Sequence, residues 1–225
     1  MRASVRDFWM EFNEPLEGRL SFMYLDVKGL VSTGVGNRID ASRGTLQEPT
    51  ASEREASHAI ARRLRWLTAD GDEATAEQID SEWDLVKSRT DLAPRGGGSF
   101  AAITSLRLPD DEIERLVFSK LDEMEGHLRR RTEFSSFDSW PADAQLGVLS
   151  MSWGMGPAFR FPRFQAFVSS DDWEGAATEC RFNPEIGTIV IRNDRNQKLF
   201  RNAARVVARD LDREALVFPA DAADV

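Results

Sequence analysis

The sequence predicts an α+β protein in which helices predominate and a small lobe carries a β-hairpin. Three observations favour this class. One segment near the N-terminus alternates apolar and polar residues as a strand does, most later segments repeat apolar residues at helical spacing, and no strand–helix–strand alternation indicates a parallel sheet. The chain has 225 residues, of which 41% are hydrophobic and 30% charged, so it is long enough for one large domain or for two lobes with a substantial core.

The N-terminal segment predicts a short helix. Residues 4–13 read SVRDFWMEFN, and their apolar side chains share one helical face. Pro15 is expected to interrupt this pattern and to start a new turn just before Glu17, because proline lacks the amide hydrogen that a helix interior uses.

A β-hairpin is expected over residues 19–36. Leu20, Phe22 and Tyr24 alternate with Ser21 and Met23, as in a strand with one buried face. DVKG then provides a turn, and LVSTGVG reads as a second short strand.

Two helical patterns follow the hairpin. The first runs from about residue 52 to residue 68, and capping boxes of Thr50 with Glu53 or of Ser52 with Glu55 both fit its start. The second covers residues 74–88.

Two other features of the region from 38 to 105 carry predictions. Trp66 and Trp83 are expected to pack in the core, since both lie at helical spacing with other apolar residues. The run RGGGSF, residues 95–100, indicates a flexible loop or linker, because it lacks the GK[ST] ending and the preceding strand of a phosphate-binding loop.

The rest of the chain predicts only helices. LPDDEIERLVFSKLDEMEGHLRRR begins with Pro109, has acidic residues early and arginines late, and forms a long amphipathic helix. PADAQLGVLSMSWGMG has apolar residues on most of its circumference and therefore predicts a buried helix. Shorter helices are expected at 161–168, 171–181 and 192–210. These elements divide the chain into residues 1–108, with an insertion at 38–105, residues 109–218, and a loose acidic tail at 219–225.

Composition argues against several classes of function. Cys180 is the only cysteine and is expected to be a small buried side chain, and His58 and His127 show no metal-binding spacing, so neither a metal nor another cofactor is expected. The net charge is −9 with Lys and Arg dispersed, so no nucleic-acid partner is expected, and any anionic polymer would have to be recognised locally. No apolar run is long enough for stable membrane insertion. MRASVRDFWMEFNEP has Asp and Glu where a signal peptide has its apolar core, which predicts synthesis in the cytoplasm without an ordinary secretory signal.

Glu17 and Asp26 are candidates for a pair of catalytic carboxylates. Cleavage of a glycosidic bond needs one acid that protonates the leaving oxygen and a second carboxylate that activates water, attacks or stabilises charge. Glu17, at the end of a helical turn beside Leu16 and Leu20, is expected in an enclosed site, and Asp26, in the hairpin turn, is expected to be more solvated. Spacing alone does not select this pair, since acids in turns and at helix ends are common and Glu14 competes with Glu17.

The surrounding residues resemble the active-site segment of the T-even phage-type lysozymes, a family of muramidases. The resemblance lies in an ungapped series of eight residues with that family's spacing: Glu17, Gly18, Tyr24, Asp26, Gly29, Ser32, Gly34 and Gly36. It continues in QLGVLSMSWGMG, whose last residues match an apolar–aromatic–x–Met–Gly ending, and in residues around Phe161, Trp173, Arg192, Arg195 and Phe200. It covers residues 1–37 and about 106–205, whereas residues 38–105 have no counterpart and Asn37 replaces the family's histidine.

The resemblance implies a lysozyme-like two-lobe fold and hydrolysis of the β-1,4 bond between N-acetylmuramic acid and N-acetylglucosamine in bacterial peptidoglycan. It implies that Glu17 is the general acid and that Asp26 and Ser32 handle the water, rather than Glu14 or Thr33. Gly36 and Trp153 would bind substrate, and Arg192 would support Glu17. The enzyme would invert the anomeric centre.

Other possibilities stay open from the sequence. The chain could be a catalytically silent binding or structural component of a phage particle or secreted toxin, or a transglycosylase or hydrolase of a chitin-like polymer. An enzyme acting in the periplasm or cell wall would need a helper, such as a holin, a phage particle or an injecting secretion system. The insertion is expected to add packing to the small lobe, with a cleft cover or a docking surface for a partner or inhibitor as the alternatives.

Overall fold

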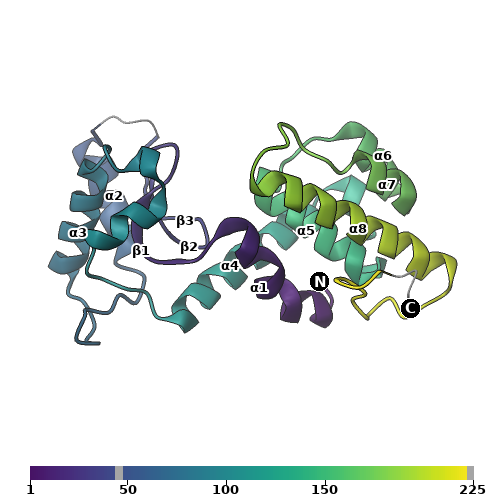
Figure 1. The fold of residues 1–225 in the computed structure, drawn as a ribbon, viewed down its shortest axis with the longest axis horizontal. Helices are drawn as coiled ribbons and strands as arrows, with labels where there is room; N and C mark the ends of the chain where they lie inside the picture. The colour runs from purple at the N-terminus through teal and green to yellow at the C-terminus, as the bar shows by residue number, and fades with distance from the viewer. Residues whose placement is uncertain (44–47, 222–225) are drawn as a thin grey trace. The chain divides into compact units, whose positions relative to one another are not determined.

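The computed structural model describes residues 1–43 and 48–221 (Figure 1). The protein is α+β and predominantly helical, as the sequence predicts, with a three-stranded antiparallel sheet in the order β1-β2-β3. The elements are α1 (Ala3–Glu17), β1 (Leu20–Leu25), β2 (Val31–Gly34), β3 (Asn37–Arg38), α2 (Ala51–Ala61), α3 (Ala76–Ser88), the 3-10 helices η1 (Ala93–Arg95) and η2 (Gly97–Ala102), α4 (Asp110–Arg129), η3 (Thr132–Phe134), η4 (Phe137–Ser139), α5 (Ala142–Met155), α6 (Pro162–Ser169), α7 (Trp173–Glu179) and α8 (Thr188–Ala208).

The chain forms two compact units, which we call the sheet unit and the helical unit. The sheet unit comprises Glu17–Phe118, and the helical unit comprises Met1–Leu16 together with the chain from Ser119 onward. The sequence division grouped the first helix with the hairpin, but in the structure its aromatic residues belong to the helical unit. The rings of Trp9 and Trp153 lie 5.4 Å apart, and those of Phe12 and Phe218 lie 5.6 Å apart.

Helix α1 continues through Pro15, contrary to the sequence prediction that the proline would interrupt it. Pro15 lies in the last turn, where its fixed φ suits a helix and the only helical bond lost is the one it would donate to the Glu11 carbonyl. Leu16 is buried and holds this turn in place. The helix ends at Glu17 because Gly18 adopts a φ of +78°, the left-handed conformation that commonly follows a helix.

The predicted hairpin is confirmed. Strand β1 pairs antiparallel with β2, with Tyr24 opposite Ser32 and Leu25 opposite Val31. The turn closes through hydrogen bonds from the Gly29 N–H to the Asp26 carbonyl and from the Asp26 N–H to the Leu30 carbonyl, both 2.9 Å long. The short strand β3, which the sequence did not predict, extends the sheet next to β2.

Helix α2 begins as predicted but ends earlier. The capping box of Thr50 with Glu53 is present, whereas the helix stops at Ala61 rather than at residue 68. The Ala61 carbonyl at the helix end accepts two hydrogen bonds, from the Leu64 N–H at 3.1 Å and from the indole Nε1–H of Trp66 at 3.0 Å. Because this folds the chain back, Trp66 reaches the core, where it is 1% exposed.

Helix α3 packs the insertion onto the sheet. Its start is fixed by a capping box of Thr75 with Gln78. Trp83 is fully buried, and its Nε1–H donates to the Ile39 carbonyl at 3.0 Å. Core positions for both tryptophans of the insertion are therefore confirmed.

The glycine run is a packed segment and not the flexible loop that the sequence predicted. Residues 97–102 form η2, and Phe100 in it is fully buried. Gly97 lies against β1, where a Cβ built on it would be 2.7 Å from Leu20 Cδ1 and 2.8 Å from Tyr24 Cδ2. Glycine is required here for close approach and not for chain flexibility.

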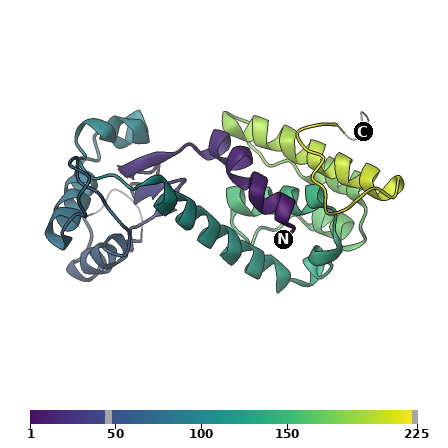
Figure 2. The same ribbon diagram turned by 90° about the horizontal axis from the view of Figure 1, so that it is seen from below.

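In the helical unit, α5 is buried from Ala142 to Trp153 and packs against α8 (Figures 1 and 2). Gly147 permits this contact, because a Cβ there would lie 2.7 Å from the Phe200 ring. Cys180 is fully buried, as predicted, and burial raises the pKa of its thiol to about 12.

The C-terminal segment is attached to this unit as far as the structure describes it. The buried carboxylate of Asp143 accepts hydrogen bonds from the N–H groups of Val217 and Phe218 at 2.8 and 3.0 Å. Asn202 donates to the Ala220 carbonyl at 3.1 Å. Residues 219–221 are thus held in place rather than loose, and residues 222–225 of the predicted tail lie outside the described residues.

None of the helices in the described part of the chain combines the length and the apolar character that crossing a membrane requires.

Candidate active site

Glu17 closes helix α1 and lies beside the turn between β2 and β3. A Cβ built on Gly36 would be 3.9 Å from Glu17 Oε2, so the glycine backbone approaches the carboxylate closely. The Glu17 side chain is exposed to solvent. This exposure differs from the enclosed setting that the sequence predicted for Glu17.

Asp26 is held rigidly by the hairpin turn. Its Oδ1 accepts hydrogen bonds from the N–H groups of Lys28 and Leu30 at 2.8 and 2.9 Å. Among the described residues, none donates a hydrogen bond to Asp26 Oδ2. One oxygen thus fixes the orientation of the carboxylate, and the other is open to a water molecule or a substrate.

Tyr24 links the two acids electrostatically. Burial raises the pKa of the Tyr24 phenol, the nearby charges of Asp26 and Glu17 raise it as well, and a backbone hydrogen bond with Gly36 lowers it, so that together these effects bring the pKa to about 12. Both carboxylates therefore lie near one phenol, and this phenol belongs to the only tyrosine in the chain.

The register of the sheet selects Ser32 rather than Thr33. Ser32 pairs directly with Tyr24, and residues opposite each other in an antiparallel pair point to the same face. Thr33 points to the other face, is fully buried, and its Oγ1 has no hydrogen-bond partner within the described chain. The Ser32 hydroxyl shares the face of the Tyr24 phenol and forms no hydrogen bond with another described residue.

The turn after β2 depends on two glycines and one asparagine. Gly34 and Gly36 have φ values of +63° and +70°, which favour glycine. Asn37 Oδ1 accepts a hydrogen bond from the Val35 N–H at 3.2 Å and thereby closes the turn. Asn37 thus has a structural role in placing Gly36 beside Glu17.

The insertion supports this site through Lys87 of helix α3. Its Nζ donates to the Gly29 carbonyl at 2.9 Å, to Asp40 Oδ2 at 2.8 Å and to the Ser42 hydroxyl at 3.2 Å. Asp40 Oδ2 also accepts from the Val31 N–H at 3.0 Å. Burial alone would raise the pKa of Asp40, but these hydrogen bonds, with the one from Lys87 foremost, hold it below its usual value. A buried ion pair therefore fixes the Asp26 turn at the side where it enters β2, through Gly29 and Val31.

Sequence reasoning did not find Lys87, Asp40 or Gly97. One signal for Lys87 exists in the sequence, since it lies four residues after Trp83 and therefore on the apolar face of its helix. A lysine on such a face needs a buried acidic partner. No local pattern identifies Asp40 as that partner or Gly97 as a neighbour of Tyr24.

Trp153 and Arg192, the other two predicted site residues, lie together in the helical unit. A Cβ built on Gly154 would be 3.3 Å from Arg192 Cδ. Arg192 is 3% exposed, and its Nη1 donates to the carbonyl and the hydroxyl of Ser150, both at 3.2 Å.

The Trp153 indole is a packing element of its unit. It is 6% exposed, with the Lys120 ammonium 4.0 Å from its ring centroid and the Trp9 ring on it at 5.4 Å. Its ring is therefore largely covered by residues of its own unit, and the substrate-binding role that the resemblance implied stays a prediction.

In the described ranges 1–43 and 48–221, no group of three or more His, Cys, Asp and Glu side chains is arranged to hold a metal ion. No family model matches the chain, and no curated protein is detectably similar to it.

Proposed function

We propose that the chain is an endo-acting N-acetylmuramidase with a lysozyme-like two-lobe fold, related to the phage-type lysozymes, which cleaves the β-1,4 bond between N-acetylmuramic acid and N-acetylglucosamine. The observation that carries this proposal is the grouping of five motif residues in one compact unit. Glu17, Tyr24, Asp26, Ser32 and Gly36 come from α1, β1, its turn, β2 and the next turn, and both acids act on the one phenol.

The proposed reaction uses the two acids in different roles. Glu17 donates its proton to the glycosidic oxygen as the bond from that oxygen to the anomeric carbon breaks. Asp26 Oδ2 and the Ser32 hydroxyl orient a water molecule on the opposite face of the sugar, and Asp26 accepts the proton that the water loses as it attacks. Such an inverting reaction requires the two carboxyl groups to lie about 6.5–9.5 Å apart.

Exposure of Glu17 bears on how this acid stays protonated. A carboxyl group in water ionises near its ordinary pKa, whereas exclusion of water favours the neutral form. We infer that the bound glycan itself covers Glu17 and supplies this exclusion. The role of Arg192 as a partner that supports Glu17 comes from the resemblance.

The proposal is tested by the clearing of purified peptidoglycan, measured as loss of turbidity. Glu17→Gln and Asp26→Asn should each reduce the rate by at least about 100-fold, the scale of a lost general acid or base. Glu14→Gln, which changes an acid one helical turn away, should leave the rate within about twofold. An active Glu17→Gln variant would falsify the assignment of the acid.

A second candidate is a protein that binds glycan without cleaving it, and the exposure of Glu17 favours it. Co-sedimentation with purified sacculi separates the two, because a silent component binds sacculi and never clears them. Mass spectrometry of released fragments then distinguishes a hydrolase, which leaves reducing ends, from a transglycosylase, which leaves anhydro-muramic ends.

The proposed partner is bacterial peptidoglycan, and the proposed place of action is the periplasm or the cell wall. A holin, a phage particle or a secretion-system carrier would bring the enzyme there.

A further inference from the structure

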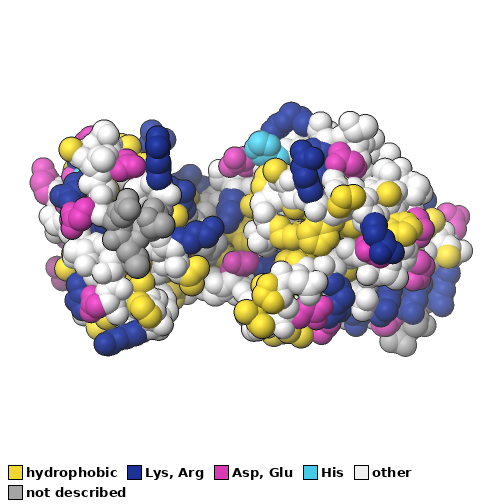
Figure 3. Space-filling model, turned by 90° about the horizontal axis from the view of Figure 1, so that it is seen from above, with side chains coloured by type: hydrophobic (Ala, Val, Ile, Leu, Met, Phe, Trp, Pro, Cys, Tyr) yellow, Lys and Arg dark blue, Asp and Glu magenta, His cyan; other side chains and the backbone are white. Residues whose placement is uncertain are grey.

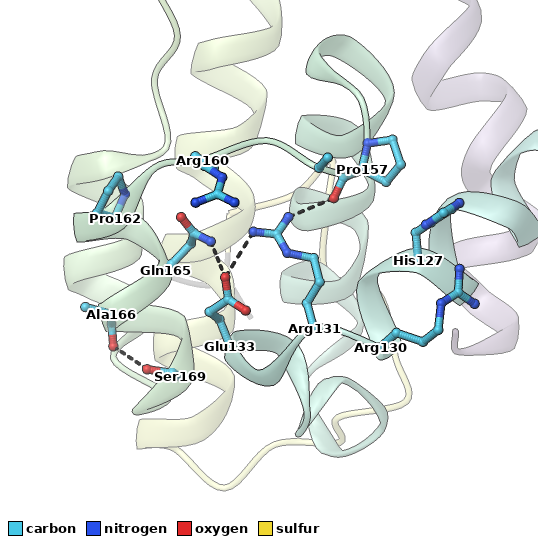
Figure 4. A pocket seen from close by; sticks show the side chains of 11 residues that line it. His127, Arg130, Arg131, Glu133, Pro157, Arg160, Pro162, Gln165, Ala166 and Ser169 are labelled. Carbon is cyan, nitrogen blue, oxygen red and sulfur yellow. Dashed lines mark hydrogen bonds and ion pairs between the residues drawn. The ribbon is translucent and has the colours of Figure 1, made fainter.

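The helical unit contains a hollow of about 740 Å³ that the proposed reaction does not use (Figure 4). It is lined by the C-terminal end of α4 and the residues after it, by residues 157–160, and by α6. Its volume is within the range of binding sites for small organic ligands and is far larger than one inorganic anion needs.

A fixed polar network forms one wall of the hollow. Arg131 donates to the carbonyls of Pro157 and Phe159 at 2.7 and 2.9 Å and pairs with Glu133 at 3.1 Å. Gln165, which is 8% exposed, donates its amide N–H to the same Glu133 carboxylate (Figure 4). The one carboxylate in the lining is thus already bonded to an arginine and an amide, and this wall is rigid.

Two further arginines line the same hollow. Arg130 and Arg160 are exposed, and neither guanidinium forms an ion pair or hydrogen bond with any residue that the structure describes. The lining therefore has three arginines and one carboxylate, in a chain with a net charge of −9. On the face drawn in Figure 3, by contrast, dark-blue Lys and Arg side chains are mixed with magenta Asp and Glu side chains. Unpaired guanidinium groups at the edge of a hollow suit carboxylates, which they bind through two parallel hydrogen bonds.

The remaining lining residues indicate more than a simple anion site. Pro157, Ala158, Pro162 and Ala166 provide small apolar surfaces between the polar groups. Such surfaces can pack against short aliphatic side chains, whereas a bare phosphate has no apolar group to place against them.

We propose that this hollow binds a short peptide that carries free carboxylates, with Arg130 and Arg160 as the groups that recognise the carboxylates. The peptide stem of the bacterial wall, which contains alanine and free carboxylates, has this chemistry. Naming the wall stem as the source rests on the proposed function, whereas binding of a carboxylate-bearing peptide does not.

The test uses the full chain and the synthetic pentapeptide L-Ala–γ-D-Glu–L-Lys–D-Ala–D-Ala. Binding is followed by NMR through the imidazole signal of His127, which lines the hollow, with buried His58 of the sheet unit as the internal reference. The peptide should shift the His127 signal in a saturable way and leave the His58 signal unchanged. The same peptide with both carboxylates amidated should bind at least about tenfold more weakly, the effect of losing one charge-assisted pair.

Variants locate the contact. Arg130→Gln with Arg160→Gln should weaken binding at least about tenfold, and since both side chains are exposed the fold should be kept. Arg163→Gln is the matched control, because Arg163 is an exposed arginine of the same helix α6 that pairs with Glu179 and does not line the hollow. Binding that is absent, or equal in the double variant, overturns the proposal.

Two further measurements separate this inference from its alternatives. Inorganic phosphate that competes with the peptide at equal affinity would reduce the site to an anion site and overturn the peptide assignment. Peptide binding by the Glu17→Gln variant should equal that of the unmodified chain. If peptidoglycan is not cleared but the peptide still binds, the proposed function fails while the peptide site stands, and the reverse result removes only the peptide site.

Discussion

Gly97 of the insertion lies so close to the ring of Tyr24 that no side chain fits between them. A Cβ on Gly97 would be 2.8 Å from Tyr24 Cδ2. Tyr24 in turn lies near both candidate catalytic acids. The segment without a counterpart in the phage-type family thus contacts the centre of the candidate site.

Gly97→Ala should therefore displace the Tyr24 ring and impair both stability and peptidoglycan clearing. Overpacking of this kind costs about 1–3 kcal/mol, which thermal unfolding measures. Gly98→Ala is the matched control, because a Cβ on Gly98 would meet no atom within 4 Å. Equal effects of the two substitutions would show that the glycine run matters for its backbone and not for its contact with Tyr24.

The ionisation of Tyr24 gives a second test. Because it is the only tyrosine, absorbance at alkaline pH follows its phenol alone, and we expect a pKa of about 12. Glu17→Gln or Asp26→Asn should lower this pKa, since each removes a negative charge that disfavours the phenolate. Glu14→Gln should leave the titration unchanged.

The same phenol predicts how stability changes at high pH. Its pKa is raised in the folded state, so the stability that it contributes is complete below the ordinary pKa near 10 and is lost as pH rises towards 12. Chemical unfolding between pH 10 and 12 should show a loss approaching about 1.4 kcal/mol per pH unit from this group. The Tyr24→Phe variant should lack this part of the slope, and an unchanged slope contradicts the assignment.

Lys87→Met should destabilise the sheet unit strongly. It would leave the buried Asp40 carboxylate without its cation, and breaking a buried pair in this way costs about 3–5 kcal/mol. Lys28→Met, which removes an exposed lysine from the Asp26 turn, should change the free energy of unfolding by less than about 0.5 kcal/mol.

Removing the Asp40 charge as well should restore part of the stability that the Lys87→Met variant loses. In Asp40→Asn with Lys87→Met neither charge of this pair remains, so the double variant should be more stable than Lys87→Met alone. In the unmodified chain the pKa of Asp40 is lowered, so its contribution is present above its ordinary pKa and is lost as pH falls through the lowered value. Acid unfolding of the unmodified chain and of both variants, monitored by circular dichroism, checks both expectations.

Substitutions at Ser32 and at Thr33 test which face of the sheet carries the functional hydroxyl. Ser32→Ala should reduce clearing about 10- to 100-fold by removing a group that orients water, while the protein keeps its stability. Thr33→Val replaces a buried hydroxyl that has no partner within the described chain and should leave both activity and stability nearly unchanged. The opposite pattern would place the functional hydroxyl on the other face of the sheet.

Local chemistry made part of the fold predictable. The Thr50 capping box and the uniformly apolar α5 are patterns within one segment, and both appear as predicted. The failures come from packing. The Ala61 carbonyl accepts from the indole of the buried Trp66, and Pro15 stays in its helix next to the buried Leu16, so burial of these side chains overrides local propensity.

The candidate site also contains features that the sequence predicted and features that it did not. The resemblance to the phage-type family was needed to choose Glu17, Asp26 and Ser32 from the sequence, and in the sheet Ser32, not Thr33, shares the face of Tyr24. The support from Lys87 joins residues 58 positions apart, as its bond to Gly29 shows. No periodicity in a single sequence encodes a contact of that length, so the role of the insertion could be found only in the structure.

The buried Cys180 makes the chain a ready background for site-directed labelling. Its pKa of about 12 leaves more than about a thousandfold less thiolate at neutral pH than an ordinary cysteine has, so it should not react with maleimides while the protein is folded. A cysteine introduced at Val27, which is 97% exposed at the tip of the Asp26 turn, would then be the one reactive thiol. A fluorophore attached there would report glycan binding next to the proposed catalytic aspartate without any further change to the sequence.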